Sequence, residues 1–169
     1  QFIAAELTAW IGSFMWPFFR IGAMMMAAPI FGVRMVPMRT RIGMAFVVTL
    51  AVAPVIGPVP AVDAFSWSGV MIIVHQIIIG ATLGFALQLV FAAFTTGGQV
   101  IALQMGLGFA TMVDPQNGAQ SPVLSQFYLI LTTLIFLAMN GHLAFIELVA
   151  ESFTLLPIAA SGFSADNYR

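Results

Sequence analysis

Charged residues are scarce in this chain of 169 residues, and cysteine is absent. Asp, Glu, Lys and Arg make up 7% of the sequence, whereas ordinary soluble domains carry about a quarter. A water-soluble globule of this composition would expose large apolar patches and aggregate. The lack of cysteine excludes disulfides, thiolate metal ligands and a cysteine nucleophile. The net charge of −1 gives no basic surface for nucleic acid.

Hydrophobic residues, in contrast, make up 61% of the chain, and the mean hydropathy is +1.05. Lipid, or a large apolar surface of a partner protein, must therefore surround it. Long apolar runs separated by turn residues are typical of membrane helices. The sequence predicts an all-α membrane protein, a single membrane-embedded domain over residues 1–169, built from several long apolar helices and helical hairpins.

Four apolar runs predict the helices, and they span residues 7–33, 42–61, 67–96 and 124–156. A helix that crosses the hydrocarbon layer needs about 20 residues. The second helix should stop near Ala53, before a proline-rich exit, which makes it short for a straight span. Arg20 lies within the first run, where a charge at bilayer depth costs about 2.5–3.5 kcal/mol. We expect Arg20 to reach the interface, to pair or to face protein.

A basic segment follows the first run and holds three of the five basic side chains, Arg34, Arg39 and Arg41. By the positive-inside tendency this segment should be cytoplasmic, which leaves the N-terminus outside. Membrane topology explains the segment most simply, and binding of a partner protein is the alternative. With Arg20, these arginines are the charged positions that we expect to fix topology or contact a partner.

Small and amide side chains share one face of the third run on a helical period: Gly80, Ala81, Gly84, Gln88, Ala92, Thr95 and Gln99. Gly80 and Gly84 form a small-xxx-small step that lets two helices approach closely. We therefore expect Gly80, Gly84 and Gln88 to pack against a neighbouring helix. A water-lined path beside Gln88 and Gln99 is the alternative.

Residues 97–123 form an irregular, glycine-rich stretch that keeps apolar patches. Its glycines allow backbone shapes that a lipid-facing helix avoids, and Asp114-Pro115 is a turn dipeptide. Non-helical backbone is tolerated at membrane depth only where it is buried in protein or lines a water-filled cavity. We therefore predict that a helix ends near Thr96 and that a buried or pore-facing loop follows.

Residues suited to catalysis are few. The sequence lacks the usual nucleophile, zinc-protease and phosphate-loop motifs. His142 and Glu147 are five positions apart, which places them on different faces of a helix and makes them a poor metal pair. Asp114 has no second acid nearby to share acid and base roles. We predict no catalytic, metal or cofactor site, and no enzyme activity.

Five stretches of the chain, in this order, resemble the FliR family of flagellar type III protein export-gate proteins. They are FMWPFFRIGAMMMAAPIFG (14–32), VRMVPMRTRIG (33–43), HQIIIGATLGFALQ (75–88), QMGLGFATMVDPQNGAQSPVLSQF (104–127) and FLAMNGHL (136–143), with LLPI (155–158) after them. The SpaR and YscT type of virulence secretion proteins shares this layout, but the run from Phe109 to Pro115 is more similar to the flagellar branch. Family members are longer, so the chain corresponds to their N-terminal two-thirds.

This resemblance implies a subunit of a helical hetero-oligomer that assembles with FliP and FliQ, associates with FlhB and contacts membrane lipid. At the flagellar basal body, in the bacterial inner membrane, that assembly would pass unfolded flagellar proteins. It also implies that a loop helps to plug the pore, through Gly106, Leu107, Gly108, Phe109, Met112, Val113, Asp114 and Pro115. The alternatives are a virulence export gate and a self-contained transporter or ion channel that uses Arg20, Gln88, Glu147 and Glu151.

Overall fold

The structure, a computed structural model, describes residues 2–31, 36–57, 59–60, 62–63, 66–107, 111–113 and 120–158. Helices make up most of this part of the chain. In order, the elements are α1 (Phe2–Ala27), α2 (Met38–Val52), the short 3-10 helix η1 (Ala53–Val55), α3 (Trp67–Gln104), β1 (Thr111–Val113), β2 (Gln120–Pro122), α4 (Val123–Ala138) and α5 (Gly141–Leu155).

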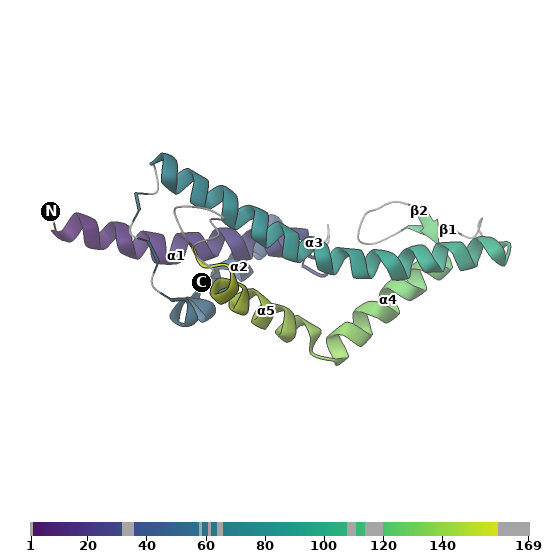
Figure 1. Cartoon of the computed structure of the whole chain (residues 1–169). Coiled ribbons are helices and arrows are strands. Elements are labelled where there is room, and N and C mark those ends of the chain that lie inside the picture. Colours follow the sequence, from purple (N-terminus) through teal and green to yellow (C-terminus); the bar gives the residue numbers. More distant parts are fainter. Residues whose placement is uncertain are drawn as a thin grey trace.

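The helices form two parts, a bundle and an arm (Figure 1). In the bundle, α1 packs along the first half of α3, with α2 and α5 against α1. Its core contains the buried side chains of Trp16 and Met24 from α1, Ile72 from α3 and Val149 from α5. The arm consists of the second half of α3 together with α4, which contacts α3 and diverges from it toward α5.

Helix α3 is the longest element and connects the two parts. Ser66 is its N-cap residue, and the Oγ of Ser66 accepts a hydrogen bond from the backbone N–H of Gly69 at 3.1 Å. This bond satisfies one of the free donors at the helix start. Its 38 residues rise about 57 Å at 1.5 Å per residue. The hydrocarbon layer of a bilayer is about 30 Å thick, so α3 is much longer than an upright span requires.

The expected end of the third helix near Thr96 is wrong, because α3 continues through Gly97 and Gly98 to Gln104. A Cβ at position 98 would lie 2.9 Å from the Cα of Ser125 in α4. Glycine at this position therefore allows α4 to pack closely on α3 and does not interrupt the helix. The irregular backbone begins only at Gly106, where φ is +72°.

A short antiparallel ribbon at the end of the arm was not predicted from the sequence. Strands β1 and β2 pair with Thr111 opposite Pro122 and Val113 opposite Gln120. The ribbon contacts the start of α4 and lies beside α3 (Figure 1).

Helices α4 and α5 meet at a sharp corner of 68°. Asn140 adopts a left-handed conformation there, with φ of 55°, and asparagine tolerates this region better than most residues. A Cβ on the next residue, Gly141, would lie 2.6 Å from the ring of Phe136. The Asn140-Gly141 pair thus lets the chain turn back toward the bundle.

Two stretches of the described chain are long and apolar enough to cross a membrane, residues 38–55 and 67–104, and the bent pair α4–α5 is a third if it counts as one span. Several threonine hydroxyls in these helices bond within their own helix, as when Thr49 Oγ1 donates to the carbonyl of Ala45 at 2.6 Å. Such bonds suit polar groups in an apolar environment. The prediction of an all-α membrane protein is confirmed, with the small ribbon as an addition.

Candidate functional site

Arg20 is the most deeply buried charged side chain in the described residues, with no exposed surface. Its Nε donates to Oε1 of Gln76 in α3 at 2.7 Å. Its Nη1 donates to the carbonyl and hydroxyl oxygens of Ser152 in α5, at 2.8 and 3.1 Å. Its Nη2 donates to the carbonyl oxygen of Leu156 at 2.8 Å, and the guanidinium carbon lies 4.0 Å from the ring centre of Phe153. We call these five residues the Arg20 cluster.

The Arg20 cluster joins three helices that are distant in the sequence. A guanidinium presents five N–H donors, which remain costly when buried unless acceptors reach them. Here the last turn of α5 supplies carbonyl oxygens, and this end of a helix carries partial negative charge. Arg20 therefore faces protein, one of the three arrangements expected for it, and it connects α1 to α3 and α5.

Gly80 and Gly84 lie where α3 crosses α1. A Cβ on Gly80 would overlap the carbonyl oxygen of Arg20, and a Cβ on Gly84 would lie 2.6 Å from the carbonyl oxygen of Met24. The two backbones are therefore in direct contact, which only glycine permits. Gln88 lies one turn further along α3 but is exposed, so it does not belong to this contact.

The basic segment lies at the start of α2. Arg39 is exposed and Arg41 is partly buried, both within the first turn of this helix. Arg34 lies outside the described residues. Arg39 and Arg41 thus lie on α2, whereas Arg20 is buried in the bundle interior, so the structure does not bring the three together.

The predicted plug loop maps to the end of the arm. Gly106 ends α3 with a positive φ of +72°, the conformation that glycine commonly supplies after a helix. Leu107 follows and is 47% exposed, and β1 contains Met112 and Val113. Four further predicted residues lie outside the described part of the chain: Gly108, Phe109, Asp114 and Pro115.

Sequence reasoning missed the partners of Arg20. Ser152 is 132 residues from Arg20 in the sequence, and no local periodicity relates them. The available signal was chemical, since Gln76 and Ser152 are polar residues in apolar helices and a buried guanidinium needs such acceptors. No three His, Asp or Glu side chains gather as a metal site within the described residues.

These features define a class: a helical membrane protein whose bundle supports an arm that carries a short ribbon. Comparison with known families then identifies the chain more closely. The sequence profile described as "Bacterial export proteins, family 1" matches residues 11–167. The chain belongs to this family and, within it, to the FliR proteins.

The relatives are flagellar. The chain is 44% identical to the flagellar biosynthetic protein FliR of Pectobacterium carotovorum subsp. carotovorum, over 92% of this chain and 59% of that protein. It is 39% identical to FliR of Escherichia coli (strain K12), over 99% of this chain and 64% of that protein. It is 31% identical to FliR of Bacillus subtilis (strain 168), over 86% of this chain and 56% of that protein. The chain thus spans about three-fifths of the length of these relatives.

Proposed function

We propose that this protein is a structural subunit of the flagellar type III protein export gate. In this role it assembles with FliP and FliQ, associates with FlhB in the bacterial inner membrane at the flagellar basal body, and helps to form the conduit for unfolded flagellar subunits. The segment from Gly106 to Pro115 closes the conduit when no subunit passes. The protein contributes a passage and a seal, and the energy for export comes from elsewhere.

The observation that carries this proposal is the group of exposed apolar side chains around the end of α3. Leu103, Met105 and Leu107, around the end of α3, are 67%, 64% and 47% exposed. Exposed apolar side chains at a chain reversal are unfavourable in water and need a sheltered location. An apolar constriction can block ions by excluding water, and glycines beside it allow the loop to move.

The exposed apolar surface of the helices supports assembly with other subunits. Phe85, Leu89 and Phe94 on α3 are each at least half exposed, as are Leu134 and Ile135 on α4. This surface continues into the arm, beyond the length that one bilayer crossing by α3 would use. Apolar helices of neighbouring subunits would cover the part that lipid does not.

A self-contained transporter fits the described residues less well. Arg20 is fully engaged with acceptors inside the bundle. Gln88, Glu147 and Glu151 are exposed, on two different helices. These four residues therefore do not converge on a single polar path.

The test is ion leakage through the assembled export gate. Replacement of Leu107, Met112 and Val113 by serine should keep the complex intact and raise the resting conductance, because water then enters the constriction. Planar-bilayer recording of the purified complex measures this. Val47→Ser is the control, because Val47 is also exposed but lies on α2 in the bundle, away from the loop, and it should leave the conductance unchanged. Unaltered conductance in a correctly assembled triple variant would refute the sealing role.

A further inference from the structure

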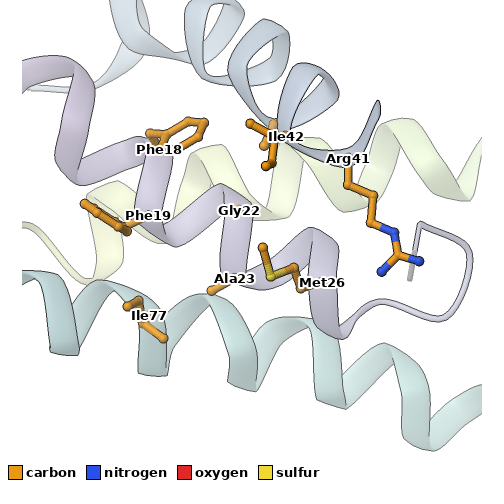
Figure 2. Close-up of a pocket in the computed structure, with 9 residues that line it drawn as sticks. Phe18, Phe19, Gly22, Ala23, Met26, Arg41, Ile42 and Ile77 are labelled. Atoms are coloured by element: carbon orange, nitrogen blue, oxygen red, sulfur yellow. The ribbon is translucent and has the colours of Figure 1, made fainter. Parts of the chain in front are cut away.

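A cavity of about 350 Å³ lies between α1, α2 and α3 (Figure 2). Its volume falls within the range of about 300–1,000 Å³ typical of ligand pockets. Phe18 and Phe19 of α1 form part of its wall, and the buried Ala45 of α2 forms part of its base. Ile42 and Ile77, on opposite sides, are 45% and 40% exposed, so the cavity opens to the surface of the bundle.

One charged side chain lines this cavity. All its lining residues are apolar except Arg41, whose guanidinium lies at one end of the group (Figure 2). Arg39 is exposed in the same turn of α2 but does not line the cavity. A ligand for this cavity must therefore combine a long apolar part with an anionic head.

We propose that the cavity binds one acyl chain of an anionic phospholipid whose phosphate pairs with Arg41. The protein is a membrane protein, so phospholipid surrounds these helices at high concentration. Apolar walls accept the chain of any phospholipid, and the arginine selects an anionic head over a zwitterionic one, as basic pockets between membrane helices do. An apolar side chain of a partner subunit would fill the cavity without using the cation. This inference is independent of the gate function.

Two glycines provide a matched test of the acyl-chain site. Gly22 lines the cavity, and a Cβ added there would meet no atom within 4 Å. Gly22→Leu should therefore fill the cavity without disturbing α1, and Ala23→Leu, at the next lining position, is a second filling variant. Gly43 on α2 also has no atom within 4 Å of an added Cβ and does not line the cavity. Gly43→Leu is the control for added apolar bulk.

The experiment is native mass spectrometry of the full-length protein, in the complex in which it purifies, with equal amounts of phosphatidylglycerol and phosphatidylcholine. The wild type and Gly43→Leu should retain one phosphatidylglycerol in preference to phosphatidylcholine. Arg41→Gln should weaken this preference about fivefold, the scale of one basic residue facing an anionic head group. Gly22→Leu and Ala23→Leu should abolish it, and circular dichroism would verify that each variant keeps its helix content.

Three outcomes would overturn the proposal. Equal retention of both lipids by the wild type would show that the cavity does not select an anionic head. If Arg41→Gln lost the preference for phosphatidylglycerol and the filling variants kept it, the preference would come from electrostatic attraction at the surface and not from the cavity. Impaired assembly of the filling variants, with lipid preference unchanged, would assign the cavity to a side chain of a partner subunit.

Discussion

Arg20 shows how a single residue can carry a charge inside an apolar bundle. Every hydrogen bond described for its guanidinium goes to a neutral acceptor, Gln76, Ser152 or Leu156. The face of the Phe153 ring adds a cation–π contact. Neutral acceptors and the negative end of α5 together replace water around the charge. The result is a residue whose main effect is on the arrangement of helices.

Replacement of Arg20 tests this role. Arg20→Leu removes the guanidinium donor from the buried Oε1 of Gln76 and from the carbonyl oxygen of Leu156, which should destabilise the bundle by about 2 kcal/mol or more. Arg39→Leu is the matched control, because Arg39 is exposed and its loss should cost less than about 0.5 kcal/mol. Thermal unfolding in detergent, followed by circular dichroism, measures both. Equal melting temperatures for the two variants would contradict the role assigned to Arg20.

Asn140 is the second residue with a conformational task. Its left-handed backbone is strained for a β-branched side chain and free of strain for glycine. Asn140→Val should lower stability by about 1–2 kcal/mol, whereas Asn140→Gly should change it little. The same unfolding measurement compares the two, and an Asn140→Val protein as stable as the glycine variant would show that the corner relaxes without cost.

At the scale of elements, the contact between α1 and α3 depends on glycine. Gly80→Ala introduces a Cβ that overlaps the backbone of Arg20, so the helices must separate, at a cost of about 1–3 kcal/mol. Gly97→Ala makes the same change on the same helix, where a Cβ meets nothing within 4 Å. It should be neutral or stabilising by up to about 1 kcal/mol, because alanine favours helix. Differential scanning calorimetry would compare the stability of the two variants. A Gly80→Ala variant as stable as the wild type would argue against close packing of α1 on α3.

The helices themselves were largely predictable, because hydropathy and turn residues are local signals. The second helix ends at Val52, next to its expected end at Ala53. The continuation of α3 beyond Thr96 was not predictable from hydropathy and turn residues. The same residue type, glycine, marks a helix contact at Gly98 and a helix end at Gly106, and only the position of α4 distinguishes them. The acceptors of Arg20 were missed for a related reason, since they come from distant helices.

At the scale of the whole molecule, α3 is long enough that part of it must lie outside the hydrocarbon layer. Only about 20 of its residues can lie in the hydrocarbon layer as an upright span, and the remainder must be covered by water or by other subunits. The chain has no cysteine, so single cysteines can be introduced along α3 without background. The residues of α3 inside and outside the hydrocarbon layer can therefore be distinguished by labelling.

A cysteine scan of α3 should show two zones in the isolated protein. In lipid nanodiscs, we expect cysteines at about 20 consecutive positions to resist a water-soluble maleimide. Cysteines at exposed positions outside this zone should react. Leu103→Cys should react if the first half of α3 is embedded, and Ile78→Cys if the second half is. In the assembled export gate, the reactive zone should become protected by neighbouring subunits. Resistance along all 38 residues of the isolated protein would instead place α3 entirely within lipid.

The hydrogen bonds of Arg20 also impose an order on biosynthesis. Ser152 is added to the nascent chain 132 residues after Arg20, which takes on the order of 10 s at the usual rate of translation. During that interval the first helix leaves the ribosome with a guanidinium that lacks its final acceptors. The first helix therefore reaches its native environment only after the fifth has been made, which leaves the early intermediate dependent on the insertion machinery to shelter this charge.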